Sequence, residues 1–323
     1  MFQHFNLSIL SRHRFTPSTL LEMLIGNAQS QHLLKSYLDI FFAGEKSAPS
    51  FYILAGPEHI GKSSYVQELL KAYLGDFFYN DLLHIKDFSA ELGKKHSLKI
   101  ELDKSETAKT LADDFQYQDI GIREITTRLQ QSFIGKMKVI LIENIERITP
   151  EAANAFLKTC EEPLAHRLII ATTSHASQLI DTIISRALVI HFNELSPKEL
   201  LAFADEQSFF PDHQELKELV CDMAMGKPGI LIQFHDLLSH DEVLKQQFIT
   251  IIGILSGKKQ LFKAHDILKN FKKNGILDAF LDGWISYCMS HGLQEQSKQR
   301  LKVKKMMRSN VNIENLMLYG LLE

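Results

Sequence analysis

The chain has 323 residues and a formal net charge of -3, with 45% hydrophobic and 23% charged residues. This composition is typical of a globular protein and excludes a disordered or fibrous chain, and the length favours two or three domains. Because the net charge is slightly negative, the protein as a whole does not attract polyanions, so any contact with nucleic acid needs a local patch.

The cysteines, the N-terminal residues and the length of the apolar runs lead to further expectations. Cys160, Cys221 and Cys288 lie too far apart for a CxxC pair or a zinc knuckle, so we predict reduced, structural cysteines and no zinc. The N-terminal residues show no basic region followed by an apolar run, and no apolar stretch of about 18 residues occurs. We therefore expect a cytoplasmic protein with no membrane partner.

The first part of the chain alternates short apolar runs with amphipathic stretches, which is the pattern of strand and helix units around a parallel sheet. Helices are predicted over Ile122–Leu129, where apolar residues have helical spacing, and from Pro150, which Thr149 can cap. The predicted buried strands are 51–55, 138–142, 167–171 and 187–192, with 82–85 as a weaker fifth.

The first predicted strand runs into a complete phosphate loop, Gly56-Pro57-Glu58-His59-Ile60-Gly61-Lys62-Ser63-Ser64, and then into a helical stretch. Gly56 and Gly61 let backbone N–H groups and a helix N-terminus face phosphates. Lys62 would reach the β- and γ-phosphates of ATP or ADP, and Ser63 would give its hydroxyl to Mg²⁺, with Ser64 in the same turn. The alternative is a glycine-rich turn that no longer binds phosphate.

A P-loop ATPase also needs a carboxylate at the end of a neighbouring strand for Mg²⁺, and usually a second acid that activates the attacking water. Glu143 directly follows the strand 138–142 and is the candidate metal-side acid, one methylene longer than the usual aspartate. Asn144 stands where the base is expected, and an amide cannot accept the proton. Glu146 could substitute, but it is predicted to belong to the following turn. We expect little hydrolysis by this chain alone.

The run from Lys138 to Pro163, with its Ala-Asn-Ala-Phe-Leu-Lys-x-x-Glu-Glu-Pro segment, closely resembles the clamp-loader family of AAA+ ATPases. Ala171-Thr172-Thr173-Ser174 resembles the first sensor strand of that family, which implies that Thr173 lies in the nucleotide site. At Gly226-Lys227-Pro228-Gly229-Ile230, isoleucine replaces the second sensor arginine. The active ATPase type carries four zinc-binding cysteines and an Asp-Glu pair, which this chain lacks, so the resemblance is to the delta-prime type.

The segment Asp181–Ala187 resembles the Ser-Arg-Cys motif of the family, with alanine in place of cysteine. The resemblance implies that Arg186 points across a subunit boundary at ATP held by a neighbour, where it would stabilise charge on the transferring phosphoryl group. Taken alone, Arg186 would be read as a surface residue in an ion pair. The trans-acting role predicts an exposed guanidinium that is free of any carboxylate of its own chain.

The resemblance implies an α/β fold class: an AAA+ P-loop parallel sheet with helices on both faces, followed by a helical lid and an all-α collar. The expected domains are an AAA+ nucleotide-binding domain over 1–195, a helical lid over 196–245 and an α-helical collar over 246–323. The boundary follows from Ser196-Pro197-Lys198-Glu199, a capping box after which the pattern is almost entirely helical.

The implied function is that of a subunit of the bacterial DNA polymerase III clamp loader. Such a subunit would bind ATP or ADP with Mg²⁺ weakly or without turnover, and would supply Arg186 in trans. The implied partners are the ATPase and delta subunits, the sliding clamp indirectly, and primed DNA through the assembled complex. The alternative is an autonomous AAA+ ATPase with its own hydrolytic site. The polar segment 91–114 is predicted to be a surface insertion.

Overall fold

The structure is a computed structural model that describes residues 26–45, 48–86, 99–103, 121–161, 164–239, 241–257, 266–271 and 277–290. The chain divides into two compact units, Met1–Asn193 and Glu194–Glu323. Most of the predicted insertion 91–114 lies outside the described residues. None of the helices that are described is long and apolar enough to span a membrane.

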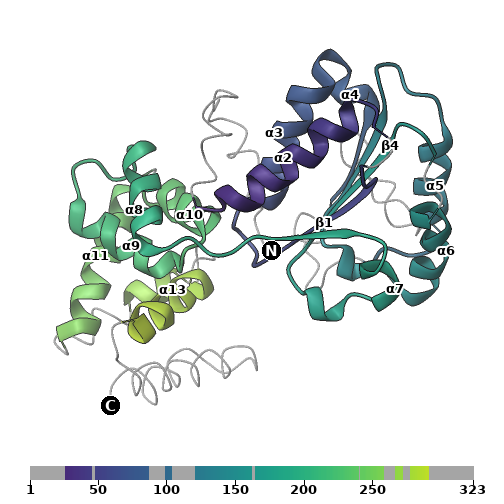
Figure 1. Cartoon of the computed structure of the whole chain (residues 1–323). Helices are drawn as coiled ribbons and strands as arrows, with labels where there is room; N and C mark the ends of the chain where they lie inside the picture. Colours follow the sequence, from purple (N-terminus) through teal and green to yellow (C-terminus); the bar gives the residue numbers. More distant parts are fainter. Residues whose placement is uncertain are drawn as a thin grey trace. The chain divides into compact units, whose positions relative to one another are not determined.

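A parallel sheet forms the centre of the first unit (Figure 1). It has five strands in the order β2-β3-β4-β1-β5. All five strand predictions are confirmed, although β4 continues two residues further and β5 is one residue shorter at each end. The bounds are β1 Phe51–Ala55, β2 Leu82–Ile85, β3 Lys138–Ile142, β4 Arg167–Thr173 and β5 Leu188–His191.

Helices cover both faces of this sheet (Figure 1). One face packs against α2 (Ala28–Phe42), α3 (Lys62–Leu74) and α4 (Phe78–Asp81), and the other against α5 (Ile122–Gln130), α6 (Pro150–Glu161) and α7 (Asp181–Ile184). Successive strand side chains point to opposite faces, so Tyr52 and Leu54 join the first core and Ile53 joins the second. The expected P-loop type of sheet with two helical layers is confirmed.

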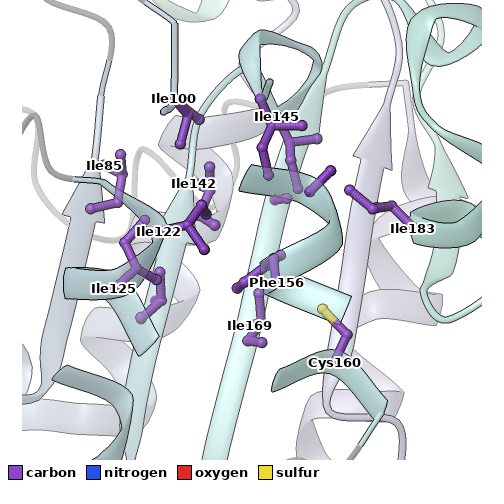
Figure 2. Close-up of a cluster of buried hydrophobic side chains, with 14 of the residues drawn as sticks. Ile85, Ile100, Ile122, Ile125, Ile142, Ile145, Phe156, Cys160, Ile169 and Ile183 are labelled. Atoms are coloured by element: carbon purple, nitrogen blue, oxygen red, sulfur yellow. The ribbon is translucent and has the colours of Figure 1, made fainter. Parts of the chain in front are cut away.

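Figure 2 shows the core beneath α5 and α6, where isoleucines of β1, β2, β3 and β4 meet the two helices. Phe156 of α6 and Ile125 of α5 are completely buried in it. Burying a side chain of this size contributes about 1.5 to 3 kcal/mol. The core therefore holds β3 and β4 firmly, and their carboxyl ends carry several of the candidate site residues.

The predicted start of α6 is confirmed. Pro150 is its first residue, and the Thr149 hydroxyl accepts a hydrogen bond from the Ala152 N–H at 3.3 Å. Proline suits this position because the N–H that it lacks would have no partner inside the helix.

The second unit is helical throughout its described parts. Ser196 caps α8 in the predicted capping box, since its hydroxyl accepts from the Glu199 N–H at 3.3 Å and the Glu199 carboxylate accepts from the Ser196 N–H at 2.7 Å. The helices are α8 Pro197–Glu206, α9 Gln214–Ala224, α10 Pro228–Ser239, α11 Glu242–Gly257 and α13 Leu277–Ser290.

Aromatic side chains pack the interior of this second unit. Phe248 lies edge-on to Phe234 and to Phe280, with ring centroids 5.7 and 5.4 Å apart. Trp284 of α13 is only 1% exposed, as expected of a core residue. The division of this unit into a lid over 196–245 and a collar over 246–323 stays a prediction, as does the first domain over 1–195.

Candidate phosphate-binding site

The phosphate loop connects the end of β1 to the start of α3. Gly61 is the last residue before α3 and has a φ of 90°, a left-handed conformation that glycine adopts without strain. The first turn of α3 then follows at Lys62, and its N–H groups have no partner within the helix. Such a helix start favours an anion.

Gly56 holds the loop against its neighbouring strands. Its N–H donates to the Thr173 carbonyl of β4 at 3.1 Å, and the Phe192 N–H donates to the Ala55 carbonyl at 2.8 Å. A Cβ atom at Gly56 would overlap the Phe192 carbonyl oxygen, which is a backbone atom and cannot rotate away. Only glycine fits this point of the loop.

We expect Gly56→Ala to lower the free energy of unfolding by about 1 to 3 kcal/mol, because the added methyl group must displace backbone. It should also weaken nucleotide binding, since the loop has to move. Gly44→Ala is the matched control, because Gly44 also has a positive φ but, in the described part of the chain, no atom lies within 4 Å of the added carbon. Urea unfolding of both variants measures the difference. Equal losses would show that the Phe192 backbone yields at little cost.

Lys62 is the positive centre of the site. Its Nζ donates to two carbonyl oxygens of its own loop, at 2.6 and 2.5 Å, and the residue is only 7% exposed. Burial lowers the pKa of Lys62 to about 8, while attraction to the carboxylates of Glu146, Glu58 and Glu143 opposes that shift. The ammonium group therefore lies among three acids: Glu58 in the phosphate loop, and Glu143 and Glu146 in the segment after β3.

Glu143 lies at the end of β3, where its N–H donates to the Ile85 carbonyl at 2.8 Å. Its carboxylate hydrogen-bonds the His84 Nε2 at 2.8 Å and also the side chain of Ser63. Burial raises the pKa of Glu143, but these hydrogen bonds and attraction to His84 and Lys86 outweigh burial, so the pKa lies below its usual value. The structure therefore brings together Ser63 and Glu143, the two predicted Mg²⁺ ligands.

The donor atoms of this pair fit magnesium. Mg²⁺ prefers oxygen ligands and is usually bound by one or two protein groups together with substrate phosphates and waters. Ser63 and Glu143 offer a hydroxyl and an ionised carboxylate beside the ammonium group of Lys62. Within the described ranges, no group of three or more His, Cys, Asp or Glu residues is placed to hold a metal ion.

Asn144 occupies the position that the sequence assigned to the missing base. Its backbone is left-handed, with φ 52°, which asparagine tolerates better than most residues. Its N–H donates to the Thr172 hydroxyl at 3.3 Å, and its carbonyl accepts from the Arg147 N–H at 3.0 Å. The chain turns here, directly after β3, into the short 3₁₀ helix η4 (Ile145–Arg147).

Glu146 is the residue that the sequence reasoning underrated. It lies in η4, as predicted, but this turn carries its carboxylate to the end of β4. There Oε1 accepts from the Ser174 N–H at 3.1 Å and from the Ser174 hydroxyl at 3.2 Å. The side chain is 9% exposed, and its attraction is the largest of those that oppose the lowering of the Lys62 pKa. Glu146 therefore belongs to the site.

The end of β4 connects this acid with the phosphate loop. The Ser174 hydroxyl that hydrogen-bonds Glu146 also lies 3.4 Å from Oε1 of Glu58 in the loop. Thr173, the predicted sensor residue, is completely buried, and its hydroxyl accepts from the His175 N–H at 3.1 Å. The hydroxyl of Ser174, the residue directly after β4, therefore contacts both Glu146 and Glu58. Ser64 is exposed in the first turn of α3.

Arg186 follows α7 and is held by groups of its own chain. Its Nε donates to Oε1 of Glu161 at 2.8 Å, Nη2 contacts the same oxygen, and Nη1 donates to the Thr182 carbonyl at 2.8 Å. The expectation of a guanidinium free of an intramolecular carboxylate is therefore wrong. The reason is that α6 and α7 pack together, which brings the end of α6 beside Arg186.

Both partners of this ion pair remain accessible to water. The side chain of Arg186 is 30% exposed and that of Glu161 is 45% exposed. Ion pairs between such partly exposed groups contribute about 0 to 1 kcal/mol. The pair orients the guanidinium without fixing it strongly.

Ile230, at the second sensor position, lies in the first turn of α10 in the second unit.

Comparison with known proteins matches this chain to subunits of DNA polymerase III. The profile of a family described as DNA polymerase III, delta subunit, matches residues 30–196. The chain is 34% identical over 190 residues to DNA polymerase III subunit delta' of Haemophilus influenzae, covering 57% of this chain and 56% of that one. It is 27% identical over 167 residues to subunit gamma of Buchnera aphidicola, covering 48% and 45%. The chain matches about half the length of these relatives.

Solved structures with a similar arrangement include a DNA polymerase III gamma-subunit-related protein of Thermotoga maritima. Its TM-score is 0.48 at 20% identity, covering 88% of this chain and 97% of that one. The RuvB Holliday junction branch migration motor of Thermotoga maritima also has a TM-score of 0.48, at 15% identity, covering 91% and 81%.

Proposed function

Since the chain belongs to the DNA polymerase III delta subunit family of clamp-loader proteins, we propose that it acts as a delta-prime type subunit of a bacterial clamp loader. In this role the first unit binds ATP or ADP with Mg²⁺ but turns it over slowly or not at all. Its contribution to catalysis is Arg186, which acts on ATP that a neighbouring subunit holds.

The observation that carries this proposal is the arrangement around Lys62. The ammonium group, the Ser63 hydroxyl and the Glu143 carboxylate meet where α3 begins, which supplies the charge and the oxygen ligands for a magnesium nucleotide. The adjacent Asn144 cannot act as a general base, because its amide does not accept a proton at neutral pH. Binding and hydrolysis are therefore separated in this chain.

The surroundings of Arg186 support a role between subunits. The side chain is partly exposed, and the ion pair with Glu161 costs little to exchange. A phosphate of a neighbour's ATP can replace the Glu161 carboxylate, because both present oxygens that match the planar guanidinium. In this account Glu161 keeps Arg186 oriented until the neighbour's nucleotide is in place.

The proposed partners are those of a clamp loader. The chain would assemble with ATPase subunits and with the delta subunit, and it would act on the sliding clamp and on primed DNA through the complete complex. A pull-down with this chain as bait, followed by mass spectrometry, identifies such partners. Recovery of DNA polymerase III subunits in stoichiometric amounts is the expected result.

Nucleotide binding by the isolated chain tests the proposed site directly. Titration calorimetry should show saturable binding of ADP and of ATP in the presence of Mg²⁺, and chelation of the metal should weaken it. If no heat of binding were detectable at millimolar nucleotide, the loop would be a vestigial turn and the proposed site would be wrong.

A second candidate function is ATP hydrolysis by this chain itself. The observation in its favour is Glu146. Its Oε2 atom is buried and has no hydrogen-bond partner among the residues that the structure describes, and its carboxylate attracts the charge of Lys62. A carboxylate there could accept a proton from an attacking water in place of Asn144. If so, Glu146→Gln should abolish turnover while MgATP still binds.

A further inference from the structure

We propose that His84 is a positioning residue for magnesium: it holds the Glu143 carboxylate in the geometry that the nucleotide-bound metal requires. This inference rests on the proposed nucleotide site. His84 itself would touch neither the metal nor the phosphates, so it acts only through Glu143.

The pairing of β2 with β3 fixes the two residues relative to each other. His84 lies opposite Leu141 in parallel register, and Ile85 lies opposite Ile142. The Glu143 N–H continues this ladder by donating to the Ile85 carbonyl at 2.8 Å. The backbone positions of His84 and Glu143 are therefore set by the sheet and not by a loop.

The side chains complete this arrangement in a buried place. Nε2 of His84 lies 2.8 Å from Oε1 of Glu143, and the two side chains are 3% and 16% exposed. A carboxylate that binds a metal ion is ionised, and an ionised carboxylate can only accept hydrogen bonds. Nε2 of His84 therefore carries the proton and donates it, which leaves that nitrogen unable to bind a metal ion.

The length of Glu143 explains why such a partner matters. A glutamate has one more rotatable bond than the aspartate expected at this position, so a free carboxylate would occupy more positions and lose more entropy on binding metal. The His84 hydrogen bond restrains one oxygen, while the Ser63 contact keeps the carboxylate beside the other predicted ligand. Losing a partner of a metal-binding group costs about 10- to 100-fold in metal affinity.

The test is a magnesium titration of ADP binding to the full chain, with ADP affinity measured from excess EDTA to saturating Mg²⁺. His84→Leu removes the hydrogen-bond donor, and His84→Asn shortens the side chain so that its N–H no longer reaches Glu143. His84→Gln keeps an amide N–H at the same distance along the side chain as Nε2 of His84. The half-saturating Mg²⁺ concentration should rise about tenfold or more in the first two variants and return toward wild type in the third.

Two controls separate positioning from a merely structural role. ADP affinity in EDTA and the thermal unfolding midpoint in EDTA should show that the variants are folded. His32→Leu, at an exposed position on α2, should leave the Mg²⁺ dependence unchanged. In a Glu143→Gln background, His84→Leu should add no further loss of Mg²⁺ affinity, because the carboxylate that it positions is gone.

Three outcomes would count against this assignment. An unchanged Mg²⁺ midpoint in folded His84→Asn protein would overturn it, as would an equal loss of ADP affinity with and without Mg²⁺. If wild-type protein bound no ADP at any Mg²⁺ concentration, the proposed nucleotide site would fail first, and the role of His84 with it.

Discussion

Lys62→Ala is expected to reduce the affinity for MgADP and MgATP by about a hundredfold, because removing one member of a buried charge pair costs about 2 to 5 kcal/mol. Lys71→Ala is the matched control: it lies on the same helix, but its ammonium group pairs with Glu68 at 2.5 Å and its side chain is 43% exposed. Calorimetry on both variants measures the difference. Equal affinities of the Lys62 variant and wild type would exclude the loop as the phosphate site.

The lowered pKa of Lys62 adds a pH dependence to this result. With a pKa of about 8, the ammonium group is mostly charged at pH 7 and mostly neutral at pH 9. The affinity of the wild type for MgADP should therefore fall by up to about tenfold per pH unit above pH 8. The Lys62→Ala variant should show no such fall. A wild-type affinity that stays constant from pH 7 to 9 would contradict the charged role of Lys62.

The same pKa indicates that Lys62 does not stabilise the ligand-free fold. A pKa below the usual value means that folding disfavours the charged form, so the unfolded chain binds more protons between about pH 8 and 10.5 and stability rises with pH across that window. At pH 7 the wild type carries this full penalty. Lys62→Met, which keeps the aliphatic stem, should thus remain folded, and its loss of nucleotide binding cannot be attributed to unfolding.

Arg186→Ala should cut DNA-stimulated ATP hydrolysis by the assembled complex by an order of magnitude or more, because an arginine finger contributes roughly 10³ to 10⁵ in rate. Nucleotide binding and folding of this chain should change little, since the ion pair with Glu161 is partly exposed. Arg186→Lys should restore only part of the rate, because lysine lacks the planar fork. Arg128→Ala, which breaks a surface pair with Glu124 on α5, is the matched control.

Glu161→Gln distinguishes a trans-acting Arg186 from a structural one. If the ion pair only stabilises this chain, replacing either partner should have the same small effect on the complex. If Arg186 acts on a neighbour's ATP, Glu161→Gln should leave hydrolysis intact or raise it, while Arg186→Ala lowers it. A complex that is indifferent to Arg186→Ala would refute the role.

The strands could be predicted from the sequence because they are short continuous apolar runs bounded by polar residues, the pattern of strands buried on both faces. The loop from Gly56 to Ser63 could be predicted because its backbone needs glycine at two defined points, and the structure confirms both the close contact at Gly56 and the left-handed conformation at Gly61. The capping box at Ser196 is likewise a local feature that the sequence contains completely.

The contacts that the sequence did not reveal join distant residues. His84 lies among apolar residues of β2, and its partner Glu143 comes 59 residues later in the chain. The pair becomes visible only when the register of β2 against β3 is known. Glu146 reaches Ser174 because the left-handed Asn144 redirects the chain after β3, which spacing alone does not indicate. The Glu161 partner of Arg186 depends in the same way on how α6 packs against α7.

The most direct test of the account is the rate of ATP hydrolysis by the isolated chain at saturating MgATP. Because Asn144 cannot act as a base, we predict a rate no higher than that of the Lys62→Ala variant, even though MgATP binds to the wild type. Appreciable hydrolysis by the wild type that Lys62→Ala abolishes would contradict the account and would establish an autonomous ATPase.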